Sequence, residues 1–341
     1  MSKPIIVSMG DPAGIGPEIA VKAWQELRDT HYHFTIVGDA APFVQAAKAI
    51  DASIDVRIVQ EISEGLPCFA QALPILQKVK LAEPVVLGNP NTANAVAIID
   101  AIKHSIELLR QGVAKAFVTL PIAKSVLYEA GFAFAGHTEF IAHKTEKMPF
   151  HHARGPVMML AIEGVKVALV TIHEPVSAVS SLLSVDRIMD VVRVVNSALK
   201  NDFDIESPRI GLLGFNPHAG ENGTIGREEI EIINPAAQLL REGGIDCSDA
   251  MPADSAFSPH SRAKYDCFIA MYHDQGLIPI KALDFWGGVN VTLGLPIIRT
   301  SPDHGTGFDI AGKNIANAES LIAAITAASS IAENRTKNDR K

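Results

Sequence analysis

Short apolar runs alternate along the chain with longer segments whose apolar residues recur at helical spacing. The runs that have the length and composition of buried strands are Ile5–Met9, Phe34–Val37 and Ala116–Leu120. Each is followed by a segment with a helical pattern, namely Gly14–Leu27, Ala41–Ile50 and Ala123–Ala130. Because strands that alternate with helices build parallel sheets, this pattern predicts an α/β fold.

Two longer helices and one hairpin complete this prediction. Ala93–Gln111 and Ser184–Lys200 are helical, and the second carries an apolar stripe that is typical of a helix packed on a core. Val157–Ile162 and Val165–Thr171 are extended runs separated by Glu163-Gly164, which is typical of a β-hairpin. We therefore expect an antiparallel element within a mainly parallel chain, and only the polar tail after residue 333 should fray.

Composition narrows the class of protein. With 341 residues and 48% hydrophobic content, the chain can form two or three domains or lobes. The formal net charge of −8 argues against nucleic-acid or anionic-membrane binding, but it allows a local cationic pocket for a phosphorylated small molecule. We expect a soluble enzyme with a small-molecule substrate.

The cysteines and the N-terminus both favour the cytoplasm. Cys68, Cys247 and Cys267 are odd in number and widely spaced, so they form neither a CxxC metal motif nor a disulfide framework. The start of the chain, MSKPIIVSMGDPAG, has too short an apolar run for a signal peptide or a membrane span. The expected location is therefore cytoplasmic.

The motif GDPAGIGPE, residues 10–18, directly follows the first predicted strand. Glycines between a strand and a helix permit a close backbone approach, and a helix N-terminus offers N–H groups to an anion. The glycine spacing departs from the dinucleotide fingerprint GxGxxG, and the two prolines stiffen the turn. A structural turn and a ligand-facing loop both remain open.

Three histidines follow apolar runs at equivalent places. His173 comes after VALVT, His218 after GLLGFN and His273 after CFIAMY. The carboxyl ends of strands in α/β sheets form the ligand-binding edge, so we expect these imidazoles to share one site. Three imidazoles with an open coordination position suit a catalytic divalent cation such as Zn²⁺.

A second group of side chains suits an anion. His137 and Thr138 stand at an expected helix start, where Thr138 either caps the helix or donates to a ligand. Lys281, Asn290 and Arg299 add cationic and amide donors, and the apolar run before Arg299 argues against a merely solvated charge. A phosphate or a carboxylate is the expected partner.

Six motifs spread over almost the whole chain carry a family resemblance. They are GDPAGIGPE, GHTEF, NPHAGENG, MPADSAF, MYHDQGLIPIK and GGVNVTLGLPIIRTSPDHGTGFDIAGK. Together they resemble the 4-hydroxythreonine-4-phosphate dehydrogenase family of vitamin B6 biosynthesis. The resemblance implies a two-lobed isocitrate/isopropylmalate-dehydrogenase-like α/β fold, with mixed sheets flanked by helices and an active site in the interlobe cleft. We expect residues 1–127 and 286–341 to form the first lobe and residues 128–285 the second.

The resemblance also implies the reaction and the assembly. Members oxidise 4-phosphooxy-L-threonine with NAD or NADP to a 3-keto acid, which loses CO₂ to give 3-amino-2-oxopropyl phosphate. They use a divalent metal (Zn, Mg or Co) and act as homodimers whose site is completed by the partner subunit.

Residue roles follow at the positions that match the family pattern. The metal ligands implied are His173, His218 and His273, and the substrate contacts are His137, Thr138, Lys281, Asn290 and Arg299. The wider fold implies a cofactor segment near residues 303–317, with contacts from His304, Gly305, Asp309 and Asn317. Asp309 would favour NAD, because a carboxylate binds a ribose hydroxyl and repels a 2′-phosphate.

The proton-transfer group and the substrate stay open at this point. Asp254, Asp274 and Lys281 are the candidates for acid–base catalysis, and Asp274 alternatively orients an imidazole. Within the superfamily, the alternative substrates are a phosphorylated sugar acid and an aromatic cis-dihydrodiol carboxylate. From another class, a metal-dependent phosphatase or a phosphometabolite binder would use the same imidazoles and cations without a dinucleotide.

Overall fold

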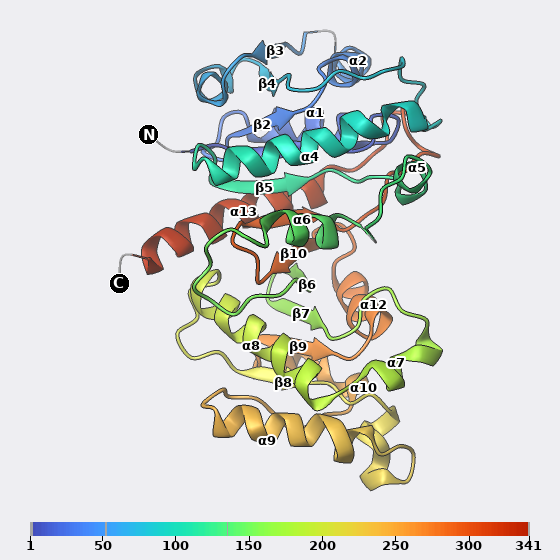
Figure 1. Ribbon diagram of the computed structural model, residues 1–341, viewed down its shortest axis with the longest axis vertical. Helices are drawn as coiled ribbons and strands as arrows, with labels where there is room; N and C mark the ends of the chain where they lie inside the picture. Colours follow the sequence, from blue (N-terminus) through green and yellow to red (C-terminus); the bar gives the residue numbers. More distant parts are fainter. Residues whose placement is uncertain (1–2, 52, 135, 340–341) are drawn as a thin grey trace. The chain divides into compact units, whose positions relative to one another are not determined.

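A computed structural model describes residues 3–51, 53–134 and 136–339 and divides the chain into two compact units. The first unit comprises Met1–Pro149 and Pro296–Ala332, and the second comprises Phe150–Leu295 and Glu333–Lys341. Each has its own group of neighbouring strands and its own flanking helices (Figure 1). The α/β class predicted from the strand–helix alternation is confirmed, and so are the mixed strand directions that the predicted hairpin implied.

The first unit contains a parallel sheet with the order β3-β4-β2-β1-β5-β11. Its strands are β1 (Ile5–Ser8), β2 (Phe34–Val37), β3 (Val56–Val59), β4 (Leu73–Leu76), β5 (Ala116–Thr119) and β11 (Arg299–Pro302). Its helices are α1 (Gly16–Leu27), α2 (Ala41–Ile50), α3 (Gly65–Cys68), α4 (Ala95–Arg110), α5 (Lys124–Glu129), α6 (His137–Thr145) and most of α13 (Glu319–Asn338), with 3₁₀ turns at Ile62–Glu64 and Thr92–Asn94.

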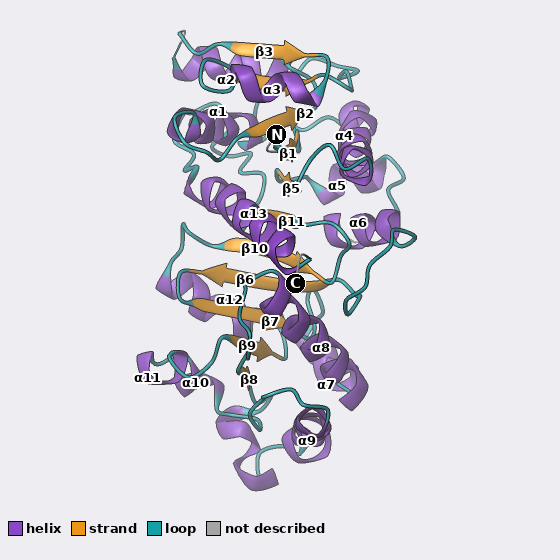
Figure 2. Ribbon diagram, turned by 90° about the vertical axis from the view of Figure 1, so that its left-hand side faces the viewer, coloured by secondary structure: helices purple, strands orange, loops and turns teal. Residues whose placement is uncertain are grey.

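The central strands β1, β2 and β5 are buried on both faces, which explains their continuous apolar sequences. Figure 2 shows α1 and α4 on opposite faces of this sheet. Since the chain passes from β1 to β2 on one side and reaches β5 on the other, the carboxyl ends of β1 and β5 form the switch point at which α/β sheets bind ligands.

The second unit contains a mixed sheet with the order β10-β6-β7-β9-β8. Its strands are β6 (Val157–Ile162), β7 (Val165–Leu169), β8 (Ile210–Leu212), β9 (Cys267–Ala270) and β10 (Val289–Leu293). Its helices are α7 (Val176–Leu182), α8 (Val185–Asn201), α9 (Asn234–Glu242), α10 (Ala253–Ala256), α11 (Pro259–Arg262) and α12 (His273–Leu283), with short helical turns η3 (Pro217–Gly223) and η4 (Glu229–Ile233).

The hairpin predicted around Glu163-Gly164 is confirmed, because β6 and β7 pair in antiparallel register, with Ile162 opposite Val165. Gly164 has a φ of +75°, the left-handed conformation that such a tight turn requires. β10 also pairs antiparallel with β6, whereas β7, β9 and β8 run parallel. The helices α8 and α12 cover opposite faces of this sheet (Figure 2).

The three cysteines lie in the interior of the structure. Cys68, Cys247 and Cys267 are buried free thiols, and burial raises the pKa of Cys267 to about 12. Among the described residues, no helix combines the length and apolarity that a membrane span requires.

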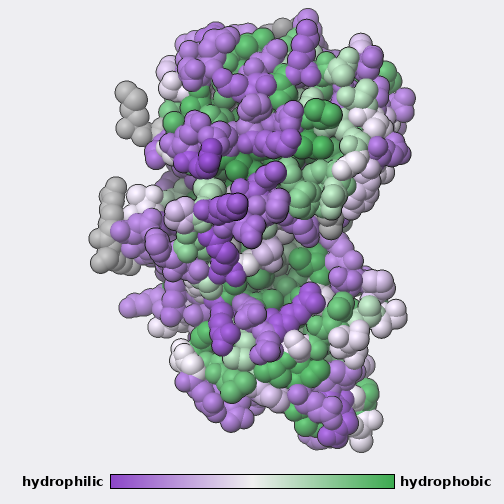
Figure 3. Space-filling model, viewed as in Figure 1, coloured by the Kyte–Doolittle hydropathy of each residue, from purple (hydrophilic) through white to green (hydrophobic). Residues whose placement is uncertain are grey.

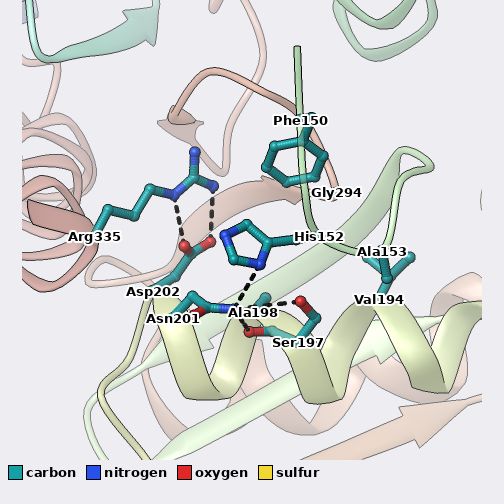
Figure 4. Close-up of a pocket in the computed structure, with 10 residues that line it drawn as sticks. All are labelled: Phe150, His152, Ala153, Val194, Ser197, Ala198, Asn201, Asp202, Gly294 and Arg335. Atoms are coloured by element: carbon teal, nitrogen blue, oxygen red, sulfur yellow. Dashed lines mark hydrogen bonds and ion pairs between the residues drawn. The ribbon is translucent and has the colours of Figure 1, made fainter. Parts of the chain in front are cut away.

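The end of α13 is fixed by a buried ion pair, so the tail does not fray where the sequence suggested. Arg335 donates from Nε and Nη2 to the two carboxylate oxygens of Asp202 at 2.6 and 3.0 Å (Figure 4). Asn334 donates to the backbone carbonyl of Asp202 at 2.8 Å. The adjoining cavity measures about 10 Å³, room for about one water molecule, so this polar cluster is structural and not a ligand site.

Removing the carboxylate of this pair should destabilise the fold. Asp202→Ala leaves the mostly buried Arg335 guanidinium without its counter-ion, which should lower the free energy of unfolding by about 3 kcal/mol. The matched control is Asp190→Ala on α8, the helix that ends directly before Asp202, because the pair of Asp190 with Arg193 is exposed and should contribute at most about 1 kcal/mol. Urea unfolding followed by circular dichroism measures both, and equal losses would contradict the role assigned to Asp202.

Candidate active site

The first unit buries a positive charge where two parallel strands carry polar side chains. Arg299 opens β11 and is 4% exposed, and its Nη2 donates to the hydroxyl of Thr119 at the end of β5, 2.7 Å away. Burial lowers the pKa of Arg299 to about 10, while the carboxylate of Glu139 acts in the opposite direction. The guanidinium therefore stays charged at neutral pH in a site of low polarity, which favours an anionic ligand.

His137 lies beside this charge at the first position of α6. Its Nε2 is buried and has no hydrogen-bond partner among the described residues, although the side chain as a whole is only half-buried. Desolvation lowers the pKa of His137 well below 6.5, and the positive charges of Arg299 and Lys124 lower it further. The imidazole is therefore neutral at pH 7 and can present either a donor or an acceptor to a ligand.

The start of α6 offers further donors. The helix follows Gly136, which has no side chain that could cap the first turn. The sequence left open whether Thr138 is a cap, but the helix begins at His137, so Thr138 stands inside the first turn. The N-terminus of α6, beside Arg299 and His137, provides backbone N–H groups for an anion.

The motif GDPAGIGPE contacts the segment at residues 304–317 within the same unit. Ile15 donates its N–H to the carbonyl of Thr306 at 2.8 Å, and a Cβ on Gly14 would lie 2.6 Å from that oxygen. The buried carboxylate of Glu18 accepts the N–H of Ala316 at 2.9 Å. The motif thus serves as the support of this segment, a role that its spacing alone did not reveal.

The residues expected to bind the dinucleotide lie along that segment. Asp309 and Gly305 are exposed, and the space that a Cβ on Gly305 would occupy is open within 4 Å. The Nδ1 atom of His304 contacts the carbonyl of Gly305 at 3.0 Å. Asn317 exchanges hydrogen bonds with Glu319 and accepts its N–H at 2.7 Å, so it caps the start of α13.

The three histidines that follow strands lie in the second unit. The imidazole rings of His173 and His273 are 5.6 Å apart between centroids, and His218 lies in the loop η3. The Nδ1 atom of His273 is 2.7 Å from a carboxylate oxygen of Asp274, which leaves Nε2 available to a ligand. Over the described parts of the chain, no three His, Cys, Asp or Glu side chains are grouped closely enough to hold a metal ion.

His218 borders a pocket of about 460 Å³ that carries further titratable groups. Asp254 at the start of α10, Asp274 and Tyr272 line it. Gln275 also lines it and ties two elements together, since its amide donates to the carbonyl of Gly214 at 2.6 Å and accepts the N–H of Met271 at 2.7 Å. The structure therefore places Asp254 and Asp274 at one pocket with His218.

Lys281 and Asn290 also belong to the second unit. The Nζ atom of Lys281, in the last turn of α12, lies 5.3 Å from the ring centre of Phe285. The Oδ1 atom of Asn290 on β10 is buried and accepts no hydrogen bond from the described residues. A buried acceptor without a donor indicates a place for a ligand or a water molecule.

Sequence reasoning missed the residues that hold the His218 loop. Asn216, Glu228 and Glu229 form a hydrogen-bonded cluster, and the amide of Asn216 is the main cause of the lowered pKa of Glu228. The signal that could have found them is the pair of adjacent glutamates a short distance after an Asn-Pro-His turn.

These features define a class of protein. One unit of this α/β chain has buried positive charge where an anion can bind. The other unit has imidazoles beside a pocket that carboxylates line. This combination is typical of an enzyme that acts on a small anionic metabolite.

Comparisons with known proteins give the family. Residues 30–328 match the family described as pyridoxal phosphate biosynthetic protein PdxA. The 4-hydroxythreonine-4-phosphate dehydrogenase of Caulobacter vibrioides is 49% identical over 334 residues, which cover 98% of this chain and 99% of the relative. The chain belongs to this family, and it is an oxidoreductase of pyridoxal phosphate biosynthesis, as its motifs predicted.

Solved structures agree. The crystal structure of 4-hydroxythreonine-4-phosphate dehydrogenase from Klebsiella pneumoniae is 35% identical, with a TM-score of 0.82 and coverage of 97% of this chain and 98% of that one. A terephthalate 1,2-cis-dihydrodiol dehydrogenase from Burkholderia xenovorans is 28% identical, with a TM-score of 0.62 and coverage of 97% and 98%.

The neutral state of the His137 imidazole predicts that the free energy of unfolding depends on pH. The unfolded chain protonates this imidazole near pH 6.5, whereas the folded protein resists protonation to a lower pH. The stabilisation is therefore complete above about pH 6.5 and is lost as the pH falls through the folded pKa. His137→Gln cannot take up the proton, so its unfolding free energy should fall less over this window, in buffer without phosphate or sulfate.

An NMR titration of the imidazole provides the direct check. The ring of His137 should titrate below 6.5, and a pKa at or above that value would refute the neutral state assigned to the free protein.

Proposed function

We propose that the chain oxidises 4-phosphooxy-L-threonine with NAD(P) and decarboxylates the product to 3-amino-2-oxopropyl phosphate. The observation that carries this proposal is the buried Arg299 beside His137 at the start of α6, where the buried Nε2 of His137 has no hydrogen-bond partner among the described residues. Such a site suits a phosphate or a carboxylate, and family membership supplies the substrate that has both. Thr138, Lys281 and Asn290 complete the proposed substrate contacts.

His173, His218 and His273 are the proposed ligands of a divalent cation, Zn²⁺, Mg²⁺ or Co²⁺. The donor set fits, since His173 and His273 are neighbours and Asp274 orients the ring of His273. A bound cation would lower the pKa of the substrate's 3-hydroxyl and stabilise charge on that oxygen during loss of CO₂.

Asp274 is the least suitable of the three proton-transfer candidates, because its carboxylate is engaged with His273. Asp254 lines the same pocket and is exposed, so it can accept the hydroxyl proton. Lys281 can return a proton to the carbon that loses CO₂. With these roles, each proton that the reaction releases or takes up has a donor or an acceptor, and the hydride of C3 passes to the nicotinamide ring.

The segment at residues 304–317 is the proposed cofactor site. The exposed carboxylate of Asp309 would accept the ribose hydroxyls of NAD and repel the 2′-phosphate of NADP, and the open space at Gly305 permits a close approach. His304 and Asn317 flank it, with Asn317 also serving as the cap of α13. NAD is therefore the expected cosubstrate.

A homodimer is the proposed assembly, with the site completed by the partner subunit. Ile278, Phe285 and Trp286 are exposed, and Ile278 lines the pocket beside Asp254. Figure 3 shows green hydrophobic areas on the face of the molecule that it presents. A partner's contribution would account for the lack of a three-ligand cluster among the described residues of one chain. Buried reduced thiols accord with work in the cytoplasm.

A second candidate substrate class is an aromatic cis-dihydrodiol carboxylate, favoured by the likeness to the terephthalate 1,2-cis-dihydrodiol dehydrogenase. Arg299 would bind the carboxylate of such a compound as well as a phosphate. A substrate panel that includes this class and phosphorylated sugar acids separates the candidates through the absorbance of reduced nicotinamide, which a phosphatase or a simple binder would not produce.

Chelation should abolish turnover, and Zn²⁺, Mg²⁺ or Co²⁺ should restore it. His218→Ala and His273→Ala should each be inactive while they keep the wild-type circular dichroism spectrum. If the site is shared between subunits, mixing the two variants under conditions of subunit exchange should recover part of the activity. Full turnover in metal-free buffer would refute the three-imidazole site, and demonstrated heterodimers without activity would refute the shared one.

Arg299 and Lys281 should select the charged groups of the substrate and leave NAD affinity unchanged. Loss of either charge-assisted contact in a partly dehydrated site should weaken transition-state binding by about 2–5 kcal/mol, and kcat/KM should fall accordingly. Arg299→Lys keeps the charge without the planar fork, so it guards against a folding defect in Arg299→Ala.

The comparison with 4-hydroxy-L-threonine isolates the phosphate contact. With this unphosphorylated compound, the loss of kcat/KM caused by the substitution should be smaller for whichever of Arg299 and Lys281 binds the phosphate. Equal penalties with and without phosphate at both residues would assign them to the carboxylate, and a wild-type preference for the unphosphorylated compound would contradict the proposed substrate.

A further inference from the structure

The loop that carries His218 has an unusual backbone. His218, Ala219, Gly220, Glu221 and Asn222 are consecutive and have φ values of 52°, 52°, 79°, 46° and 54°. Four of the five are not glycine, and the left-handed conformation is unfavourable for residues that carry a Cβ atom. Such a run persists only where surrounding contacts hold it, and strain of this kind concentrates at functional sites.

Asn216 fixes the entrance to this loop through two glutamates. Its backbone N–H donates to Oε1 of Glu229 at 2.7 Å, and its side-chain amide donates to Oε2 of Glu229 at 3.0 Å and to Oε2 of Glu228 at 2.7 Å. The hydroxyl of Ser180 on α7 donates to the other oxygen of Glu228 at 2.8 Å. The carbonyl of Asn216 in turn accepts the N–H of Ala219 at 3.1 Å, so the clamp reaches into the left-handed run.

The carboxylate of Glu229 fills a slot that the loop closes from both sides. Glu229 is 2% exposed and begins the π-helical turn η4, a distortion that is common at functional sites. A Cβ on Gly220 would lie 2.6 Å from its Oε2, and a Cβ on Gly214 would lie 3.3 Å from its Oε1. Two glycines therefore allow the strand end before the loop and the middle of the loop to approach one buried carboxylate.

We propose that Glu229 is a positioning residue that holds the His218 loop in its left-handed conformation and so sets the affinity of the site for a divalent cation. The proposal rests on the proposed function, because it takes His218 to be a metal ligand. Glu229 acts through Asn216 and the loop backbone, and it makes no contact with the substrate or the ion.

The amide of Asn216 makes the arrangement specific for a carboxylate. The NH₂ group of this amide donates to the carboxylates of both Glu228 and Glu229. If the amide turned over to accept a hydrogen bond at position 229, its oxygen would face the negative charge of Glu228. Glu229→Gln keeps the size of the side chain, but either orientation of its amide places an N–H₂ group against a donor of Asn216. The substitution should therefore release the loop with little change in packing.

The test measures Co²⁺ binding to the chelated full-length protein by its visible absorption. Loss of a residue that orients a metal ligand typically weakens metal affinity about 10–100-fold, and we expect Glu229→Gln to fall in this range. The KM for Co²⁺ in turnover should rise with it, while kcat at saturating Co²⁺ should be largely retained. The matched control is Glu231→Gln, an exposed glutamate in the same turn that pairs with Arg227 and should bind Co²⁺ as wild type does.

Two further variants make the outcome decisive. The double variant Asn216→Ala/Glu229→Gln should bind Co²⁺ no more weakly than the weaker of the two single variants, because both substitutions break the same hydrogen bonds between residues 216 and 229. Additive losses would overturn the proposal, as would wild-type Co²⁺ affinity in a folded Glu229→Gln protein whose thermal stability alone is reduced.

His218→Ala, measured in parallel, separates this proposal from the proposed function. Wild-type Co²⁺ affinity in His218→Ala would refute the metal-ligand assignment itself. Weakened binding in His218→Ala together with wild-type binding in Glu229→Gln would overturn only the positioning role of Glu229.

Discussion

The buried charge of Arg299 is the constraint around which the candidate site of the first unit is built. Parallel pairing of β5 with β11 places Arg299 opposite Phe117, two residues before the hydroxyl of Thr119 that accepts its hydrogen bond. Desolvation depresses the pKa of the neighbouring His137, and the positive charge of the buried guanidinium depresses it further. An arriving anion would place a further negative charge beside this buried guanidinium, which favours its binding.

The elements that could be predicted from the sequence are those whose signals are local. The strand–helix alternation, the hairpin at Glu163-Gly164 and the placement of histidines after strands all depend on neighbouring residues, and the structure contains each of them. The helix start at His137 could not be fixed in the same way, since a threonine at such a place is as often a cap as a ligand contact.

The features that sequence reasoning missed depend on partners far apart in the chain. The tail after residue 333 looks too polar to be ordered, yet α13 extends to Asn338 because Arg335 meets Asp202, 133 positions earlier. GDPAGIGPE reads as a turn, but its function as a support depends on Thr306 and Ala316. No local pattern encodes such pairings.

Preorganisation is achieved by different means for the two kinds of site residue. Arg299 is fixed by burial, because surrounding atoms leave its guanidinium one place to lie. His218 is exposed, as the proposed metal ligand has to be in order to meet an ion and a substrate, so burial does not fix it. Its position must come from the backbone, and a run of left-handed residues has few alternatives once its ends are held. The buried carboxylate of Glu229, which holds the backbone of the His218 loop, therefore does for the second unit what burial of the guanidinium does for the first: it fixes the position of a site residue.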